Sequence, residues 1–93
     1  MRLSKEEVAS IKKIITDVFG KATIYLFGSR LEENKKGGDI DLFIVVEDKD
    51  SLVEKKVKAL SRLERELHKP VDIVVHKNFN REIEQEAMKG KIL

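Results

Sequence analysis

Two aspartates at the head of an apolar segment constrain this chain more than any other feature of its sequence. Asp39 and Asp41 are two residues apart and lead into Leu-Phe-Ile-Val-Val. Along an alternating strand, both carboxylates lie on one face, about 6–7 Å apart. Carboxylates this close repel one another unless a cation lies between them. The pattern therefore indicates a divalent metal site where a strand begins.

A Gly-Ser pair provides groups that could bind a phosphate beside such a metal site. Gly28 and Ser29 end the apolar run Ile-Tyr-Leu-Phe, and Arg30 follows them. Backbone N–H groups in a turn and a serine hydroxyl suit a phosphate, and a guanidinium adds a charge-assisted contact. An ordinary turn and an exposed arginine are the alternative interpretations. Together with the aspartate pair, these residues predict a nucleotide site.

Asp72 is a third candidate carboxylate, because it interrupts the apolar run Val-Asp-Ile-Val-Val. Its apolar neighbours face one side of a strand, so Asp72 projects to the other side. A carboxylate in such a strand needs a partner. A metal is one possibility, and Lys69 or Lys77 is the other. His76 shares the side of Asp72 but lies roughly 13 Å along the strand, too far for the same metal.

The spacing of apolar residues predicts alternating helices and strands. Ser4 and Glu7 form a capping-box pattern that begins a helix near residue 5, and Gly20 ends it. Strands are predicted over 22–27, 40–46 and 71–75 from their β-branched and aromatic content.

Two further helices complete the predicted order of elements. Ser51 and Glu54 repeat the capping-box pattern before a long helix, and His68 is expected in its last turn. The last helix, about 81–89, carries Ile83, Ala87 and Met88, and the final Lys-Gly-Lys-Ile-Leu is expected to fray. The apolar face of the long helix is predicted to comprise Leu52, Val53, Val57, Leu60, Leu63 and Leu67.

These elements predict an α/β fold with one domain over residues 1–93. The strands 40–46 and 71–75 are joined by a helix, which favours a parallel right-handed crossover. The strands 22–27 and 40–46 are joined by a loop and are expected to run antiparallel. A mixed sheet of three or four strands, with helices packed on it, follows.

Composition narrows the classes of function. The 93 residues include no cysteine, so a disulfide framework and a thiolate metal site are excluded. No signal-peptide pattern opens the chain and no apolar stretch approaches a membrane span, so we expect a cytoplasmic location without membrane attachment. A net charge of +2 and five aromatic residues argue against nucleic acid as the partner.

The ordered set Gly28-Ser29, a polar loop, Asp39-x-Asp41 and Asp72 resembles the nucleotidyltransferase superfamily that includes DNA polymerase beta, in particular its minimal nucleotidyltransferases. The resemblance implies a palm-like sheet. It also implies that the three aspartates are catalytic and bind two Mg²⁺ ions, and that Gly28, Ser29 and Arg30 bind the nucleotide.

The resemblance further implies transfer of a nucleoside monophosphate, AMP from ATP, to a hydroxyl. Proteins of this kind resemble the antitoxin partner of an all-helical HEPN-domain ribonuclease toxin, whose tyrosine would be the acceptor. The exposed Ile92 and Leu93 are candidate interface residues, and a homo-oligomer is also compatible with the sequence. A non-catalytic module that neutralises or scaffolds a partner by contact is the alternative. Nucleotidyl transfer to RNA is a further, weaker alternative.

Overall fold

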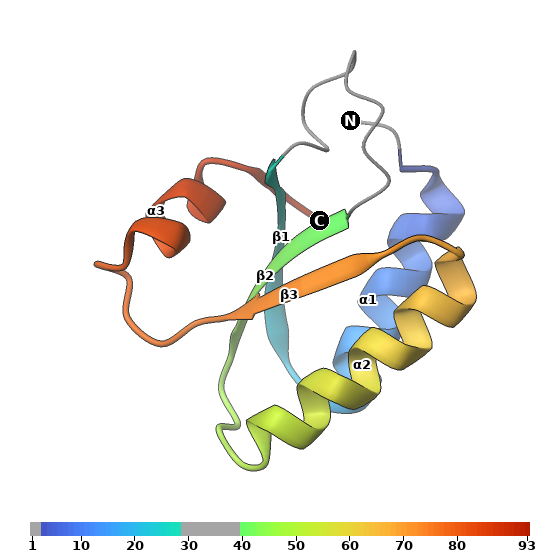
Figure 1. Ribbon diagram of the computed structural model, residues 1–93, viewed down its shortest axis with the longest axis horizontal. Helices are drawn as coiled ribbons and strands as arrows, with labels where there is room; N and C mark the ends of the chain where they lie inside the picture. Colours follow the sequence, from blue (N-terminus) through green and yellow to red (C-terminus); the bar gives the residue numbers. More distant parts are fainter. Residues whose placement is uncertain (1–2, 29–39) are drawn as a thin grey trace.

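The computed structural model describes residues 3–28 and 40–93, so Ser29, Arg30 and Asp39 lie outside the described residues. The strand order of the sheet is β3-β2-β1-β4 (Figure 1). The elements are α1 (Lys5–Phe19), β1 (Ala22–Phe27), β2 (Ile40–Val46), α2 (Leu52–Leu67), β3 (Val71–Val75), α3 (Glu82–Met88) and β4 (Lys91–Ile92).

Strand directions agree with the sequence prediction. β1 pairs antiparallel with β2, and β2 pairs parallel with β3 across the α2 crossover. β4 joins the other side of β1 in an antiparallel pair. The predicted small α/β fold with a mixed sheet is confirmed. Within the described residues, no helix has the length and apolar character needed to cross a membrane.

Helices cover the two faces of the sheet unequally. Both α1 and α2 lie against one face, and α3 alone lies on the other (Figure 1). Leu42 and Ile44 are fully buried in the larger core with α1 and α2. Phe43 points to the opposite face and packs with Phe27 and with Ala87 of α3. The odd-numbered residues of β2, Asp41 among them, therefore face the side of α3.

The start and end of α1 are set by the predicted residues. Ser4 Oγ accepts the N–H of Glu7 at 3.0 Å, and Glu7 Oε1 accepts the N–H of Ser4 at 3.0 Å. Gly20 ends the helix at φ +82°. Glu7 also accepts a bond from Lys69 at 2.9 Å. The Ser4 N–H, and then Lys69, lower the pKa of the Glu7 carboxyl.

Two predictions for α2 are wrong. Ser51 has a left-handed backbone, φ 54°, and its side chain makes no cap hydrogen bond. Val53 and Val57 are 75% and 62% exposed, whereas Leu63 is buried. At 100° per residue, Val53 lies about 80° and Val57 about 120° around the helix from Leu63. The buried stripe is narrower than predicted because, among the described elements, α2 packs mainly against α1 and β3.

The C-terminal residues form a strand, so the prediction that they fray is wrong. Tyr25 of β1 pairs with Ile92, and Leu93 donates its N–H to Ile24 O at 2.9 Å. Gly90 makes this pairing possible. A Cβ at position 90 would overlap the carbonyl oxygen of Leu26 and lie 2.9 Å from Phe27 Cβ.

Replacing Gly90 by alanine should therefore lower the free energy of unfolding by about 1–2 kcal/mol, because the added methyl meets backbone and forces β4 away from β1. The cost is limited because β4 is only two residues long. Urea titration of the variant measures it. Wild-type stability with unchanged amide exchange at Ile92 would contradict the expected displacement.

Candidate functional site

Asp41 and Asp72 lie beside one another on the α3 side of the sheet. They are register partners in the parallel β2–β3 pair. Adjacent strands are about 4.8 Å apart, so the two backbones hold their carboxylates in one neighbourhood. The structure brings together these two of the three predicted carboxylates, while Asp39 lies outside the described residues.

Gly28 lies directly against Asp41. Phe27, the last residue of β1, is the register partner of Asp41, and Gly28 follows it at φ +82°. A Cβ at position 28 would overlap Asp41 Oδ2 and lie 3.1 Å from Asp41 Cγ. Any other residue would therefore be strained in its backbone and would displace the carboxylate. Ser29 and Arg30, the other predicted phosphate contacts, lie outside the described residues.

The Asp72 side chain is exposed, and its Oδ1 accepts the N–H of Ile73 at 3.0 Å. Within residues 3–28 and 40–93, Asp72 forms no ion pair. Lys69 instead contacts Glu7 at 2.9 Å. The described residues therefore do not support the interpretation that a neighbouring lysine satisfies Asp72.

The oxygen ligands present suit Mg²⁺, which binds proteins through one or two carboxylates and completes its shell with water or phosphate oxygens. Asp41 and Asp72 provide two carboxylates on adjacent strands. No cluster of three carboxylate or imidazole groups occurs in the described part of the chain. The predicted third ligand, Asp39, is not in that part.

A buried carboxylate that the sequence prediction missed ties α3 to the end of β3. Glu84 has no exposed surface, although it lies in a helix whose other glutamates look alike in sequence. Glu84 Oε2 accepts the N–H groups of Lys77 at 2.8 Å and Asn78 at 3.0 Å, and it contacts Arg81 Nη1 at 2.9 Å. Glu84 Oε1 lies 2.7 Å from His76 Nδ1.

These donors hold Glu84 in its ionised form. Burial alone would raise the pKa of Glu84, but the Asn78 N–H, the His76 ring and the Lys77 N–H outweigh it and lower the pKa to about 2. The His76 ring also stacks on Phe79 at a centroid distance of 3.9 Å. Glu84 thus fixes α3 on the face that carries Asp41.

Of the apolar residues that the predicted last helix carries, Ile83 is 43% exposed and Ala87 is buried. In α3, the buried residues Glu84 and Ala87 form the face that lies against the sheet. Arg81, three residues before Glu84, is the only sequence signal for this arrangement, because an i,i+3 spacing allows an ion pair.

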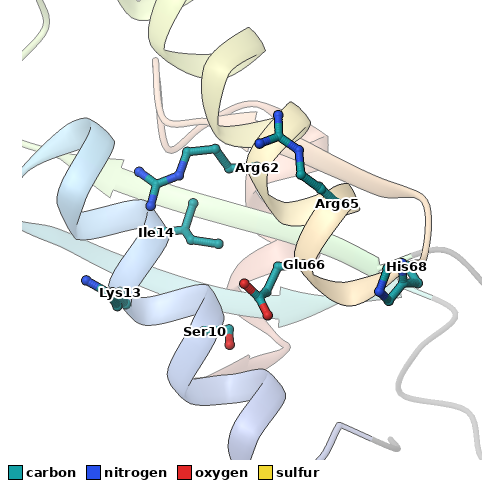
Figure 2. Close-up of a pocket in the computed structure, with 7 residues that line it drawn as sticks. All are labelled: Ser10, Lys13, Ile14, Arg62, Arg65, Glu66 and His68. Carbon is teal, nitrogen blue, oxygen red and sulfur yellow. The ribbon is translucent and has the colours of Figure 1, made fainter.

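A hollow of about 240 Å³ lies between α1 and α2, away from Asp41 and Asp72 (Figure 2). Arg62, Arg65, Glu66 and His68 line it from the side of α2. Arg62 lies 3.6 Å from Asp17 of α1. His68, predicted in the last helical turn, is the residue that caps α2, at φ 56°. Lys13 and Arg62, two of the three cations that line the hollow, both pair with Asp17, Lys13 at 3.3 Å, so their charges are already compensated.

Comparison with known proteins places the chain in a family. The family described as "Polymerase beta, Nucleotidyltransferase" matches residues 9–93, which is most of the sequence. A comparison with curated proteins finds no significant match. The matched segment contains β1, β2 and β3, and with them Gly28, Asp41 and Asp72. The chain belongs to the polymerase beta nucleotidyltransferase family.

Proposed function

We propose that this nucleotidyltransferase transfers AMP from ATP to a hydroxyl group of a partner protein in a reaction that requires Mg²⁺. Family membership supports nucleotidyl transfer in general. The observation that carries the proposal to particular residues is the pairing of Asp41 with Asp72 on adjacent strands. The close approach of Gly28 to the Asp41 carboxylate adds to it, because phosphate binding at such a turn also requires a small residue.

Asp41 and Asp72, together with Asp39, would hold two Mg²⁺ ions. When bound, these ions neutralise charge on the triphosphate and favour ionisation of the attacking hydroxyl. Ser29 and Arg30 would bind phosphate oxygens through a hydroxyl and a guanidinium. The acceptor oxygen forms a bond to the α-phosphorus while the bond to pyrophosphate breaks, and the Asp72 carboxylate takes up the hydroxyl proton.

The proposed acceptor is a tyrosine hydroxyl on an all-helical HEPN-type ribonuclease toxin, which makes this chain the antitoxin of a pair. The support is the resemblance of the short motif set to minimal nucleotidyltransferases. Ile92, 60% exposed on β4, remains a candidate interface residue. Leu93 does not suit that role as well, because it packs against the larger core.

The test uses ATP labelled on the α-phosphate, Mg²⁺ and a helical partner protein recovered by co-purification with the chain. Asp39→Asn, Asp41→Asn and Asp72→Asn should each lower label transfer at least about 100-fold, because each removes one charge that neutralises the metal pair. Asp50→Asn is the matched control, since Asp50 is exposed and lies two residues before α2, and it should transfer label as wild type does.

Unfolding curves of the four variants show whether a loss of transfer reflects a loss of fold. Transfer that persists in Asp41→Asn and Asp72→Asn would contradict the assignment of the site. Absence of label on the partner, with the complex intact in wild type, would instead support neutralisation of the partner by contact.

A further inference from the structure

β3 is one of the two edge strands of the sheet (Figure 1). The backbone groups of alternate residues form its outer edge. Ile40 donates its N–H to Pro70 O and His76 donates to Ile44 O, both at 2.9 Å. With the parallel register of β2 and β3, these bonds turn the backbone groups of even-numbered β3 residues toward β2. The backbone groups of Val71, Ile73 and Val75 therefore point away from the sheet.

Side chains already occupy two of the three outward N–H groups. Glu64 Oε2 accepts the N–H of Val71 at 3.0 Å, and Asp72 Oδ1 accepts the N–H of Ile73 at 3.0 Å. Within the described residues, the N–H of Val75 has no acceptor. Carboxylates thus protect the first part of the edge, and the part near Val75 is open to another chain.

A groove of about 280 Å³ runs beside the open part of this edge. Its floor includes Val74 and Val75 of β3, and Val53 of α2 lines it with 75% of its surface exposed. An extended segment lying here would find main-chain groups on β3 and an apolar side chain on α2.

The charged groups of the groove are mostly positive. Lys56, Lys77 and Arg81 line it, and Asp72 is the only acid among the lining residues. Arg81 already contacts Glu84 at 2.9 Å, whereas Lys56 and Lys77 form no ion pair within the described residues. These two lysines are therefore available to an incoming anion.

We propose that the β3 edge binds an extended acidic segment of a partner protein, which adds to the sheet as a strand beside β3. Main-chain hydrogen bonds to the N–H of Val75 and to the outward carbonyl oxygens of Ile73 and Val75 would supply affinity, and the lysines would select acidic side chains. A second copy of this chain fits less well, because pairing β3 with β3 brings the same cations of both copies to one edge. The proposal does not depend on nucleotidyl transfer.

The probe is an acetylated, amidated seven-residue peptide of alternating Glu and Val, compared with one of alternating Lys and Val. Amide signals of the ¹⁵N-labelled chain report the contact. We expect the acidic peptide to shift the signals of Ile73 and Val75 and to slow exchange of the Val75 amide at least about tenfold. The basic peptide should do neither.

The variant Lys56→Glu with Lys77→Glu should bind the acidic peptide at least about tenfold more weakly, since each reversal replaces attraction by repulsion. Lys58→Glu with Lys89→Glu is the matched control, because it changes the net charge equally at exposed positions outside the groove. Thermal unfolding of both variants verifies their folds.

Three results would overturn the proposal. The first is an absence of shifts at the β3 amides with millimolar acidic peptide. The second is an equal response to the basic peptide or in the groove variant. The third is concentration-dependent broadening of the same amides without peptide, which would show that a second copy occupies the edge.

Discussion

Replacing Glu84 by glutamine should lower the free energy of unfolding at neutral pH by about 2–3 kcal/mol, equivalent to about 10–20 °C in melting temperature. The glutamine amide can accept through one oxygen, but its NH₂ group would face another donor. At least one of the contacts to His76, Lys77, Asn78 and Arg81 is therefore lost without replacement. Thermal and urea unfolding measure the loss.

The pH dependence of the stability of the same variant should reveal the protonation state of Glu84. The pKa of Glu84 is about 2 in the folded protein, below its ordinary value of 4.5. A carboxyl whose pKa is lowered by folding contributes stability that is complete above its unfolded pKa and is lost as pH falls through its folded pKa. The difference between wild type and Glu84→Gln should therefore be largest above about pH 4.5 and shrink toward pH 2.

Glu86 provides the matched control for Glu84. It lies in the same helix, but its side chain is 70% exposed, and its ion pair among the described residues is with Lys89, at 3.4 Å. Glu86→Gln should change the free energy of unfolding by less than about 0.5 kcal/mol. A Glu84→Gln variant as stable as the Glu86→Gln variant at pH 7 would show that the contacts of Glu84 contribute no net stability.

Replacing Gly28 by alanine should lower label transfer about 100-fold, because the new methyl group displaces the Asp41 carboxylate and a displacement of about 1 Å can cost this much in rate. The substitution also costs about 1–3 kcal/mol of backbone strain at φ +82°. Transfer from labelled ATP and urea unfolding measure the two effects separately.

The variant Gly20→Ala distinguishes the effect of backbone strain from the effect of displacing the Asp41 carboxylate. Gly20 has the same φ of +82°, but a Cβ there would meet nothing within 4 Å. It should lose stability through strain while keeping transfer near the wild-type rate. Adding Asp41→Ala to Gly28→Ala should recover part of the lost stability, because the overlapping oxygen is gone. No recovery, or equal transfer in Gly20→Ala and Gly28→Ala, would contradict a direct effect on Asp41.

The strands could be predicted from sequence because their residue types indicate where each strand begins and ends and which side chains face the core. The runs 22–27, 40–46 and 71–75 are rich in β-branched and aromatic residues and end at Gly28 or begin after Pro70, and the structure has the same bounds. Placement of Asp41 beside Asp72 also follows from sequence, since a helical crossover makes β2 and β3 parallel.

The features that the sequence did not predict depend on contacts between residues distant in the chain, or on which face of a helix packs against the sheet. Lys91 and Ile92 carry no strand signal of their own, and they form β4 because β1 offers a free edge and Gly90 permits close approach. Glu84 resembles its exposed neighbours Glu82 and Glu86 in sequence. Its burial is favourable only after β3 and α3 bring four donors around it.

The hydrogen bond from the outward N–H of Ile73 holds Oδ1 of the Asp72 carboxylate at the edge of the sheet. On turning toward a metal beside Asp41, Asp72 would leave Ile73 with an unpaired outward N–H. A strand that accepts this N–H would, in turn, remove one reason for Asp72 to stay at the edge. Because coupling between two binding events is reciprocal, a partner that binds β3 in this way would raise metal affinity by the same factor by which metal raises affinity for the partner. The position of the Asp72 carboxylate would then couple partner binding at the β3 edge to metal binding beside Asp41.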